Sequence, residues 1–352
     1  MRAVVYTEKG GPEVLKLQND FPAPTRAKGE ILVKVISSAV NPVDWKLRKS
    51  FIPFFPNPKV VGCDVCGVVA EADSGSRFNK GDRVFFMLPI VATQGGCAEY
   101  VTVREGHADF APRNLDDDQA AGLPLVGQTV LQGYEAVGIT EKLRGQNKSI
   151  LIHAGAGGVG SVAIQVAKYY GLYVYTTCSA SNFDFVKSIG ADRPIDYKTE
   201  AFEEVAVNVD YIFDLMGGDY ELRGMKCINP SGYYINVMNS GWATKIASAL
   251  DMPDGVTGAE NTLGNLIGYA YAAYRKLAAP VTGPYYYYNV VQPRADSLKL
   301  LAKLADEGAV KPITDSVYSL EDTAEAHRRI EGGHARGKVV IRVAQSTSSS
   351  SL

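Results

Sequence analysis

Three glycines in the segment SILIHAGAGGVGSVAIQVAKYYG have a spacing that lets a backbone turn hold phosphate groups. Gly155, Gly157 and Gly160 form the pattern G-x-G-x-x-G between an apolar strand and an amphipathic helix. In that context the first glycine permits a tight turn, the second lets backbone N–H groups approach a pyrophosphate, and the third lets the helix pack on the strand. We therefore predict a dinucleotide site, as opposed to a purely structural turn, with contacts from Gly155, Gly157, Gly158, Val159 and Gly160.

The next strand ends at Cys178 and Ser179, where the ribose of the cofactor is expected to lie. An Asp or Glu at this point binds the ribose hydroxyls of NAD, but this chain has no acid there. Ser179, Ser181 and Asn182 instead offer small polar groups that tolerate a 2′-phosphate, which favours NADPH. The turn contains no Arg or Lys, so NADH remains an alternative.

Cys63 and Cys66 in VVGCDVCGVV have the spacing with which half of many zinc sites begins. A redox pair, or a strand that happens to contain two thiols, are the alternatives. Residues 63 and 66 of an extended strand point to opposite faces, which disfavours a disulfide. Only Cys97 is available beyond the pair for a four-cysteine zinc site, so we predict no metal and keep Cys63 as a candidate reactive thiol.

Composition and missing motifs disfavour several function classes. The formal net charge of -2, without a long Lys/Arg run, disfavours a nucleic-acid partner. Hydrolysis is disfavoured because no G-x-S-x-G motif occurs and no histidine lies beside a nucleophile motif. No apolar stretch approaches about 18 residues, so we expect no membrane span, and the few scattered cysteines fit a reducing compartment.

Two patterns along the chain indicate the elements that must position these residues. Residues 1–125 contain short β-branched runs separated by turn signals, which indicates a β-rich domain. From Ser149, strands alternate with helices, as in a parallel sheet covered by helices. After PYYYYNVVQP the chain returns to elements that we assign to the first domain. We predict an α/β protein with one discontinuous domain, 1–125 and 292–352, and a second at 126–291.

Seven motifs in order resemble those of the medium-chain dehydrogenase/reductase superfamily, and most closely its zinc-independent quinone oxidoreductases and enone or alkenal reductases. They span nearly the whole chain: NPVDWKLR, GCDVCGVV, KGDRVF, LPLVGQTVLQGY, the glycine motif, FVKSIGADRPIDYK and GHARGKVVI. The resemblance implies a GroES-like catalytic domain and a Rossmann NADP-binding domain with the active site between them. It also implies NADPH as hydride donor and a quinone or an α,β-unsaturated carbonyl as acceptor.

The resemblance also implies roles for single residues. Asn41 in NPVD and Thr129 in GQT match positions that hold the nicotinamide end of the cofactor. Ser179 and Tyr197 match positions near the 2′-phosphate. Lys338 in GHARGK matches a place where the C-terminal strand approaches the cofactor phosphates, with an ordinary surface lysine as the alternative.

The same motifs bear on whether the protein binds a catalytic zinc and on which residue could donate to the substrate. The zinc-dependent alcohol dehydrogenases of this superfamily need a Cys in the loop that reads NPVDWK here, and a His-Glu pair where this chain has Cys63 and Asp64. A zinc-free enzyme is therefore implied, in which Asp64 supports the floor of the cleft. Lys46 is our candidate donor to the enolate oxygen of a reduced enone, with a solvated lysine on a surface turn as the alternative.

Further expectations concern partners, specificity and location. One tyrosine pair of PYYYYNVVQP is expected to line a homodimer interface, with a pocket as the alternative. The segment from Trp242 to Ala279 is expected to vary with substrate. A non-catalytic NADP(H)-binding paralogue is the competing hypothesis. We expect a cytoplasmic protein, with a peroxisome-like organelle as the alternative because the chain ends in Ser-Ser-Leu.

Overall fold

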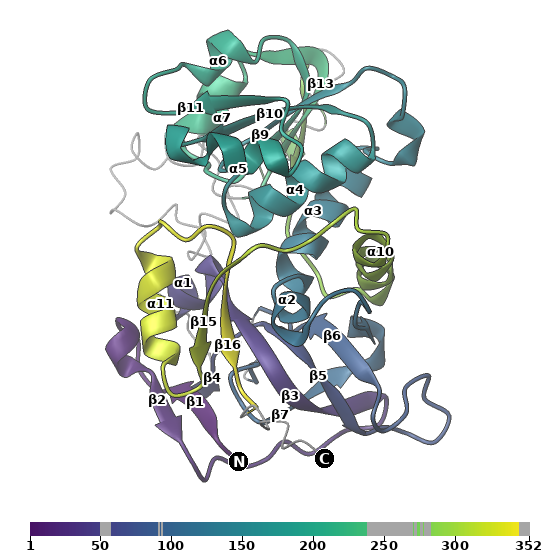
Figure 1. Cartoon of the computed structure of the whole chain (residues 1–352), viewed down its shortest axis with the longest axis vertical. Coiled ribbons are helices and arrows are strands. Elements are labelled where there is room, and N and C mark those ends of the chain that lie inside the picture. The colour runs from purple at the N-terminus through teal and green to yellow at the C-terminus, as the bar shows by residue number, and fades with distance from the viewer. Residues whose placement is uncertain are drawn as a thin grey trace. The chain divides into compact units, whose positions relative to one another are not determined.

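The computed structural model describes residues 1–49, 58–90, 92, 94–237, 270, 273, 274, 277 and 283–344. The chain divides into two compact units (Figure 1). The first unit is built from Met1–Gln128 and Gln292–Leu352, and the second from Thr129–Val291. The predicted specificity segment, 242–279, lies almost wholly outside the described residues, and the Ser-Ser-Leu terminus lies outside them.

Two sheets organise the first unit. A three-stranded sheet has the order β2-β1-β4, and a seven-stranded sheet has the order β15-β16-β3-β5-β6-β8, with β7 also paired to β3. The strands are β1 (Ala3–Tyr6), β2 (Lys16–Gln18), β3 (Glu30–Val40), β4 (Lys59–Val60), β5 (Asp64–Glu71), β6 (Arg83–Met87), β7 (Tyr100–Arg104), β8 (Ala108–Phe110), β15 (Thr314–Ser319) and β16 (Lys338–Arg342). Because β16 runs antiparallel to β3, with Val339 opposite Val40, the C-terminal segment belongs to the same unit as the N-terminal strands.

Helices of the first unit include two in its N-terminal part, where the sequence indicated only strands and turns. They are α1 (Pro42–Lys49), α2 (Asp117–Ala121), α10 (Ala295–Asp306) and α11 (Thr323–Glu331), with the short helices η1 (Pro12–Val14) and η2 (Glu105–His107). NPVDWK was expected to be a loop or turn, but it forms α1. Pro42 fits the first helical position, and the Asp44 carboxylate accepts the Asn41 N–H at 2.7 Å, as in half of a capping box.

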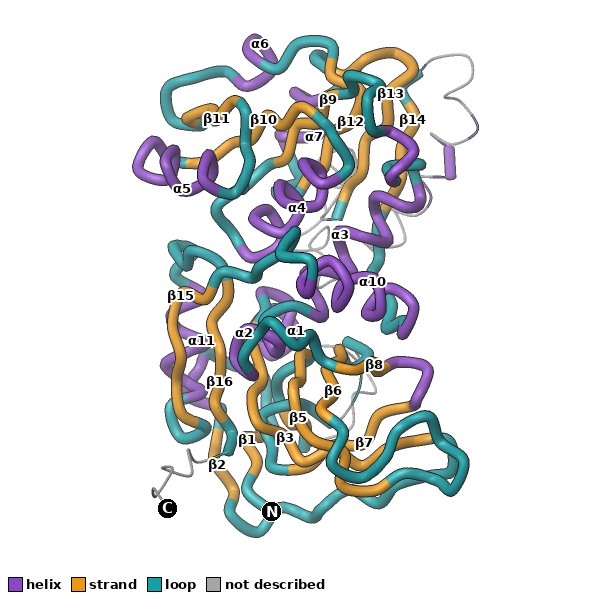
Figure 2. The backbone as a smooth tube through the Cα atoms, turned by 45° about the vertical axis from the view of Figure 1, so that its right-hand side comes forward, coloured by secondary structure: helices purple, strands orange, loops and turns teal. Residues whose placement is uncertain are grey.

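A six-stranded parallel sheet forms the centre of the second unit, in the order β11-β10-β9-β12-β13-β14 (Figure 2). Its strands are β9 (Ser149–Ile152), β10 (Tyr173–Cys178), β11 (Arg193–Asp196), β12 (Val209–Asp214), β13 (Ile228–Asn236) and β14 (Tyr285–Tyr288). The chain winds outward from β9 to β11 and then restarts at β12 on the other side of β9. This reversal is the switch point of a doubly wound sheet, and the predicted α/β fold class is confirmed.

Helices cover both faces of this sheet. They are α3 (Pro124–Ala136), which begins in the first unit, α4 (Gly158–Tyr169), α5 (Phe183–Ser188), α6 (Phe202–Val205) and α7 (Asp219–Gly224), with η3 (Glu141–Leu143) and η4 (Ala180–Asn182). On one face, Tyr134 of α3 packs edge-on against Phe213 and donates to the carbonyl of Ala163 in α4 at 3.0 Å. Side chains alternate along each strand, so Ile212 and Tyr234 point to the opposite face.

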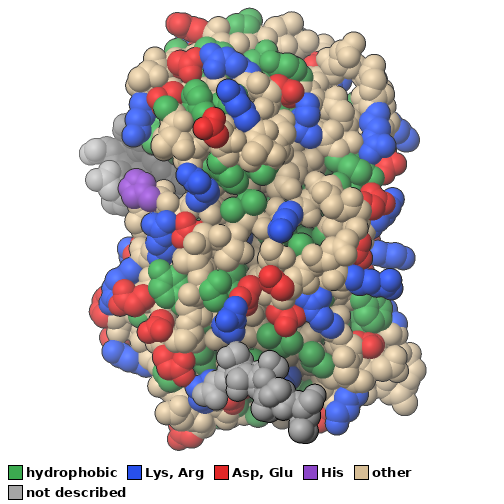
Figure 3. Space-filling view, in the orientation of Figure 1, with side chains coloured by type: hydrophobic (Ala, Val, Ile, Leu, Met, Phe, Trp, Pro, Cys, Tyr) green, Lys and Arg blue, Asp and Glu red, His purple; other side chains and the backbone are tan. Residues whose placement is uncertain are grey.

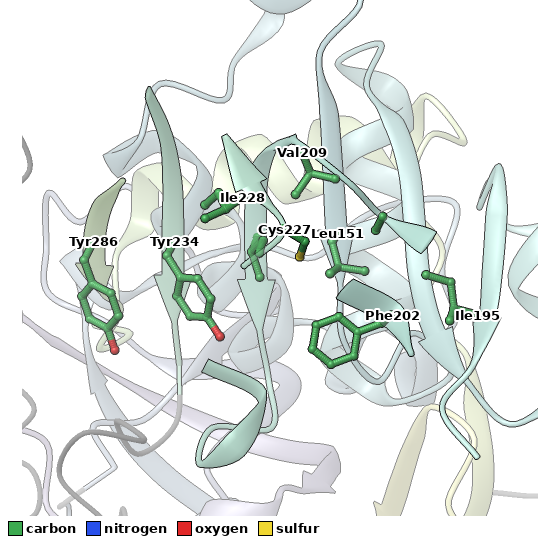
Figure 4. Packing of buried hydrophobic residues seen from close by; sticks show 10 residues of the cluster. Leu151, Ile195, Phe202, Val209, Cys227, Ile228, Tyr234 and Tyr286 are labelled. Atoms are coloured by element: carbon green, nitrogen blue, oxygen red, sulfur yellow. The ribbon is translucent and has the colours of Figure 1, made fainter. Parts of the chain in front are cut away.

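That opposite face carries an apolar cluster under α6 and α7 (Figure 4). Phe202 of α6 is 1% exposed and packs with Leu151 and Ile212 of the central strands. Tyr234 and Tyr286 project from neighbouring strands with their rings stacked, 5.6 Å between centroids. Truncation of one such buried side chain to Ala typically costs about 2–5 kcal/mol, so this cluster contributes to the stability of the second unit.

Two features bear on nucleic acid and membrane, neither of which the sequence predicts as a partner: the distribution of surface charge and the length of the helices. On the face drawn in Figure 3, Lys and Arg side chains alternate with Asp and Glu and form no field of one sign. No helix among the described residues is long and apolar enough to cross a membrane.

Candidate functional site

In the glycine turn between β9 and α4, two of the three glycines have no space for a side chain and one has space for it. A Cβ atom at Gly155 would lie 2.0 Å from Thr176 Oγ1, and one at Gly160 would lie 2.2 Å from the carbonyl oxygen of Ala154. Packing therefore requires glycine at both positions, at Gly160 as the sequence predicted and at Gly155 because of Thr176, where the sequence predicted a tight turn. A Cβ at Gly157 would meet only the Ala154 carbonyl oxygen, at 3.3 Å, so this glycine leaves open space before the helix.

The N-terminus of α4 has the properties of an anion site. Gly157 is its N-cap and no side chain caps the helix there. The N–H groups of Gly158, Val159 and Gly160 belong to the first turn, where a helix offers them no carbonyl partner. Such N–H groups, together with the helix dipole, favour a phosphate, so the residues present fit the pyrophosphate of a dinucleotide.

Residues before the turn fix its shape. Ala154 has a left-handed φ of 54°, and its carbonyl accepts the Gly157 N–H at 3.0 Å. Thr177 Oγ1 lies 3.2 Å from both the Ala154 N–H and His153 Nδ1. Burial lowers the pKa of His153 to about 4, so the ring is neutral near pH 7 and supports the turn without adding charge.

The predicted 2′-phosphate residues come together at the ends of β10 and β11. The parallel register places Cys178 opposite Asp196, and the Tyr197 N–H donates to the Cys178 carbonyl at 3.3 Å. Ser179 Oγ lies 3.1 Å from Ser181 Oγ and accepts Asn182 Nδ2 at 3.0 Å. These exposed and half-buried hydroxyl groups form a polar rim without a carboxylate in the β10 turn.

Lys198 is a charged residue at this rim that the sequence reasoning missed. It follows Tyr197 directly, is exposed, and its Nζ lies 5.9 Å from the centroid of the Tyr197 ring. The turn after β10 itself contains no cation. The signal is the strand order, because β11 lies beside β10 and brings its end residues to the same place.

In the first unit, three predicted residues form a buried polar network. Asp64 is 0% exposed, and its carboxylate accepts Asn41 Nδ2 at 2.9 Å, Lys338 Nζ at 3.0 Å and the N–H of Leu125 at 2.7 Å. Lys338 Nζ also donates to Asn41 Oδ1. Asp64 thus joins β5, β16 and the start of α3, and the Asn41 side chain uses both ends of its amide inside this network.

The position of Lys338 bears on its two predicted roles, a residue near the cofactor phosphates or an ordinary surface lysine. Lys338 is the first residue of β16 and is only 3% exposed, so the alternative of an ordinary surface lysine is wrong. Its ammonium bonds to Asp64 and Asn41. A direct contact with cofactor phosphates stays a prediction.

Lys46 lies on α1, half-buried, with its Nζ 5.9 Å from the Trp45 ring centroid. It therefore lies on a helix and not on the surface turn that was the alternative to a donor role. The helix is anchored by Arg48, which is fully buried and donates to the Gly10 carbonyl at 3.1 Å and to His327 Nδ1 at 2.9 Å. These contacts of Arg48 tie α1 to the segment at Gly10 and to α11, and a catalytic role for Lys46 stays a prediction.

Cys63 and Cys66, whose spacing resembles half of a zinc site, contact different residues. Cys63 is 6% exposed and donates to the Asp44 carboxylate at 3.2 Å, whereas Cys66 faces Asp117. Burial, followed by the negative charge of Asp44, raises the pKa of the Cys63 thiol well above its ordinary value, which disfavours the predicted reactivity. No group of three or more His, Cys, Asp or Glu among the described residues is arranged to hold a metal ion.

Thr129 lies on α3 and is 2% exposed. Its carbonyl oxygen accepts Asn289 Nδ2 at 2.7 Å, and Asn289 follows β14 directly. The sequence reasoning did not single out Asn289, because a lone Asn after a tyrosine-rich strand carries no motif. The second unit therefore holds an uncapped helix N-terminus, a rim with hydroxyl groups, and a buried hydrogen bond from the Asn289 amide to the Thr129 carbonyl.

Known proteins are similar to this chain over most of its length. Residues 27–113 match the alcohol dehydrogenase GroES-like domain, and residues 189–341 match the zinc-binding dehydrogenase family. The chain is 31% identical to a chloroplast envelope quinone oxidoreductase homolog of Arabidopsis thaliana, over 97% of this chain and 98% of that protein. It is 34% identical to an NADPH-dependent alkenal/one oxidoreductase of the same plant, over 97% of this chain and 79% of the relative. Among solved structures, the quinone oxidoreductase of Coxiella burnetii superimposes with a TM-score of 0.79 at 31% identity, covering 98% of this chain and 99% of that one.

Proposed function

The chain belongs to the medium-chain dehydrogenase/reductase superfamily, in its quinone and enone reductase branch, and from this premise we propose that it reduces quinones or α,β-unsaturated carbonyls with NADPH. The observation that carries the proposal is the uncapped N-terminus of α4 behind Gly157, which fits a dinucleotide pyrophosphate. The names of the relatives support the acceptor class.

NADPH is proposed over NADH because of the rim at β10 and β11. Ser179, Ser181 and Tyr197 offer hydroxyl groups to a 2′-phosphate, and Lys198 adds a positive charge beside them. A carboxylate that would repel the phosphate is missing from the β10 turn. The relative that is named as NADPH-dependent supports the same choice.

The chemistry requires little from the protein beyond positioning and one donor. When bound, NADPH supplies a hydride from C4 of its nicotinamide, which adds to the β-carbon of an enone. The electron pair of the double bond then moves to the carbonyl oxygen, where the Lys46 ammonium donates a hydrogen bond. Water protonates the α-carbon, so one NADPH and one proton are consumed per saturated carbonyl formed. A quinone takes up the same hydride and proton and becomes a hydroquinone.

Further parts of the proposal concern organisation. We propose that residues 1–125 and 292–352 form the GroES-like catalytic domain, that residues 126–291 form the NADP-binding domain, and that no zinc takes part. Asn41, Thr129 and Lys338 are proposed to serve the cofactor, with Asn41 and Lys338 positioned through Asp64. A homodimer that uses the edge strand β14, and a cytoplasmic location, remain predictions.

The proposal is tested by following the oxidation of NADPH and of NADH by absorbance, with 1,2- and 1,4-quinones, 2-alkenals and cyclic enones as acceptors. We expect turnover of at least one acceptor class and a preference for NADPH. Tight NADPH binding without turnover of any acceptor would favour the non-catalytic paralogue. Activity that is lost with a chelator and restored by zinc would contradict the zinc-free mechanism.

A further inference from the structure

The side-chain amide of Asn289 is buried, and only one of its two ends makes a hydrogen bond to a residue that the structure describes. It is 3% exposed, and its backbone N–H donates to the carbonyl of Asn236, the last residue of β13, at 2.7 Å. Its side-chain Nδ2 donates to the Thr129 carbonyl at 2.7 Å. Among the described residues, Asn289 Oδ1 has no hydrogen-bond partner.

The orientation of this amide is fixed by chemistry. The Thr129 carbonyl can only accept a hydrogen bond, so the NH2 group of Asn289 must face it and Oδ1 must point elsewhere. A buried acceptor that stays without a donor costs about 1–3 kcal/mol. An amide kept in this position is therefore expected to meet a donor from outside the protein.

Helix α3 makes room for the amide. A Cβ atom at Gly133 would lie 2.9 Å from Asn289 Nδ2 and 3.1 Å from the Phe213 ring. Any larger residue at 133 would push Asn289 away from Thr129. The glycine thus lets the helix approach the end of β14 closely enough for the hydrogen bond to form.

The position of Asn289 on the sheet identifies the donor. The glycine turn follows β9, and the predicted adenosine side lies over β10 and β11. In a doubly wound sheet the other half of a dinucleotide lies beyond the switch point, at the carboxyl ends of β12, β13 and β14. Asn289 stands at the ends of β13 and β14, beside Thr129.

We propose that Asn289 Oδ1 accepts a hydrogen bond from the carboxamide NH2 of the nicotinamide, so that Asn289 fixes the rotation of the ring about its ribose bond. This assignment rests on the proposed binding of NADPH. It makes Asn289 a cofactor-recognition residue of the second unit, held in place by the Thr129 carbonyl and by Gly133.

The test compares dissociation constants of NADPH and its 3-acetylpyridine analogue, in which a methyl group replaces the amide NH2. We expect the wild-type chain to bind NADPH about tenfold more tightly than the analogue, the size of one buried hydrogen bond. Asn289→Ala should bind NADPH and the analogue about equally, since the acceptor is removed. Affinity for 2′,5′-ADP, which lacks the nicotinamide, should be unchanged.

Tyr234→Phe is the matched control, because it removes another buried hydrogen bond of the same sheet, from Tyr234 OH to Asp214 at 2.8 Å. It should keep the wild-type preference. An equal preference in wild type and Asn289→Ala, with 2′,5′-ADP affinity intact, would overturn the assignment but not the proposed function. If Asn289→Ala does not fold, a wild-type chain that binds both dinucleotides equally overturns the assignment by itself. Failure of the wild type to bind NADPH at all overturns both.

Discussion

The Lys338 ammonium lies 3.0 Å from the buried Asp64 carboxylate, although the two residues are 274 positions apart in sequence. Asp64 binds Asn41 and the first turn of α3 through the same carboxylate. The ion pair therefore connects the C-terminal strand to two segments that the proposed mechanism places near the cofactor.

Lys338→Met should destabilise the first unit strongly. Removal of one partner from a buried ion pair leaves an uncompensated charge and typically costs about 3–5 kcal/mol. We expect this loss in the free energy of unfolding measured with urea. Lys303→Met is the control, because Lys303 and Glu307 are exposed and 3.8 Å apart, so its loss should have little effect. Near wild-type stability of Lys338→Met would contradict the buried pair.

Substitutions in the glycine turn should separate folding from binding. Gly160→Ala places a methyl group 2.2 Å from the Ala154 carbonyl oxygen and should lower stability by about 1–3 kcal/mol. Gly157→Ala meets that oxygen at 3.3 Å and should fold, but weaken NADPH binding by about tenfold or more because the methyl group enters the space before α4. Thermal unfolding and fluorescence titration measure the two effects.

Gly106→Ala provides the control for both variants, since no atom lies within 4 Å of the added methyl group. It should change neither stability nor binding by much. If Gly157→Ala bound NADPH as tightly as wild type, the turn would not be the pyrophosphate site.

Stability should fall as pH is lowered because of His153. Burial lowers its pKa from 6.5 to about 4, so between these values the unfolded chain binds a proton that the folded chain excludes. This contribution to stability is complete above about pH 6.5 and is lost toward pH 4, with a slope of about 1.4 kcal/mol per pH unit. His153→Phe should reduce the slope of the unfolding free energy in that range by this amount, while Thr177→Val, which keeps the histidine, should retain it.

Much of the second unit could be predicted from the sequence because its signals are local. Gly160 is required by contacts within the strand–turn–helix segment itself, and Gly155 by Thr176 of the next strand along the chain. The alternation of strands and helices is also visible along the chain. The first turn of α1 was missed for a local reason too, because Asn41 and Pro42 are typical of turns as well as of helix starts.

Other site residues depend on which distant segments become neighbours. Lys338 has no local feature that distinguishes it from a surface lysine, and only the pairing of β16 with β3 brings it to Asn41 and Asp64. Lys198 and Asn289 matter because of strand order at the ends of β11 and β14. Such order follows from packing of the whole unit, which single-sequence patterns do not encode.

Lys198→Ala should reduce the preference for NADPH. The exposed ammonium beside Tyr197 is expected to attract the 2′-phosphate, and loss of one exposed charge contact corresponds to about a threefold to fivefold weaker affinity. NADH affinity should not change, and the difference should shrink as salt is raised. Lys142→Ala, at an exposed lysine of η3, is the control. Equal losses for NADPH and NADH would indicate that Lys198 acts through folding and not through the phosphate.

Lys46→Met should lower kcat for enones without changing NADPH affinity. The ammonium is proposed to donate to the enolate oxygen, and removal of one such donor typically lowers kcat by about 10²-fold. Lys46→Arg keeps a donor and should retain more activity than Met. Lys49→Met is the control on the same helix, since Lys49 Nζ binds Glu331 at 2.6 Å and is assigned no part in the chemistry. Steady-state kinetics with a 2-alkenal, together with NADPH titration, distinguish the outcomes. An unchanged kcat in Lys46→Met would mean that water or another donor stabilises the enolate. The lysine on the anchored helix α1 would then have no catalytic role.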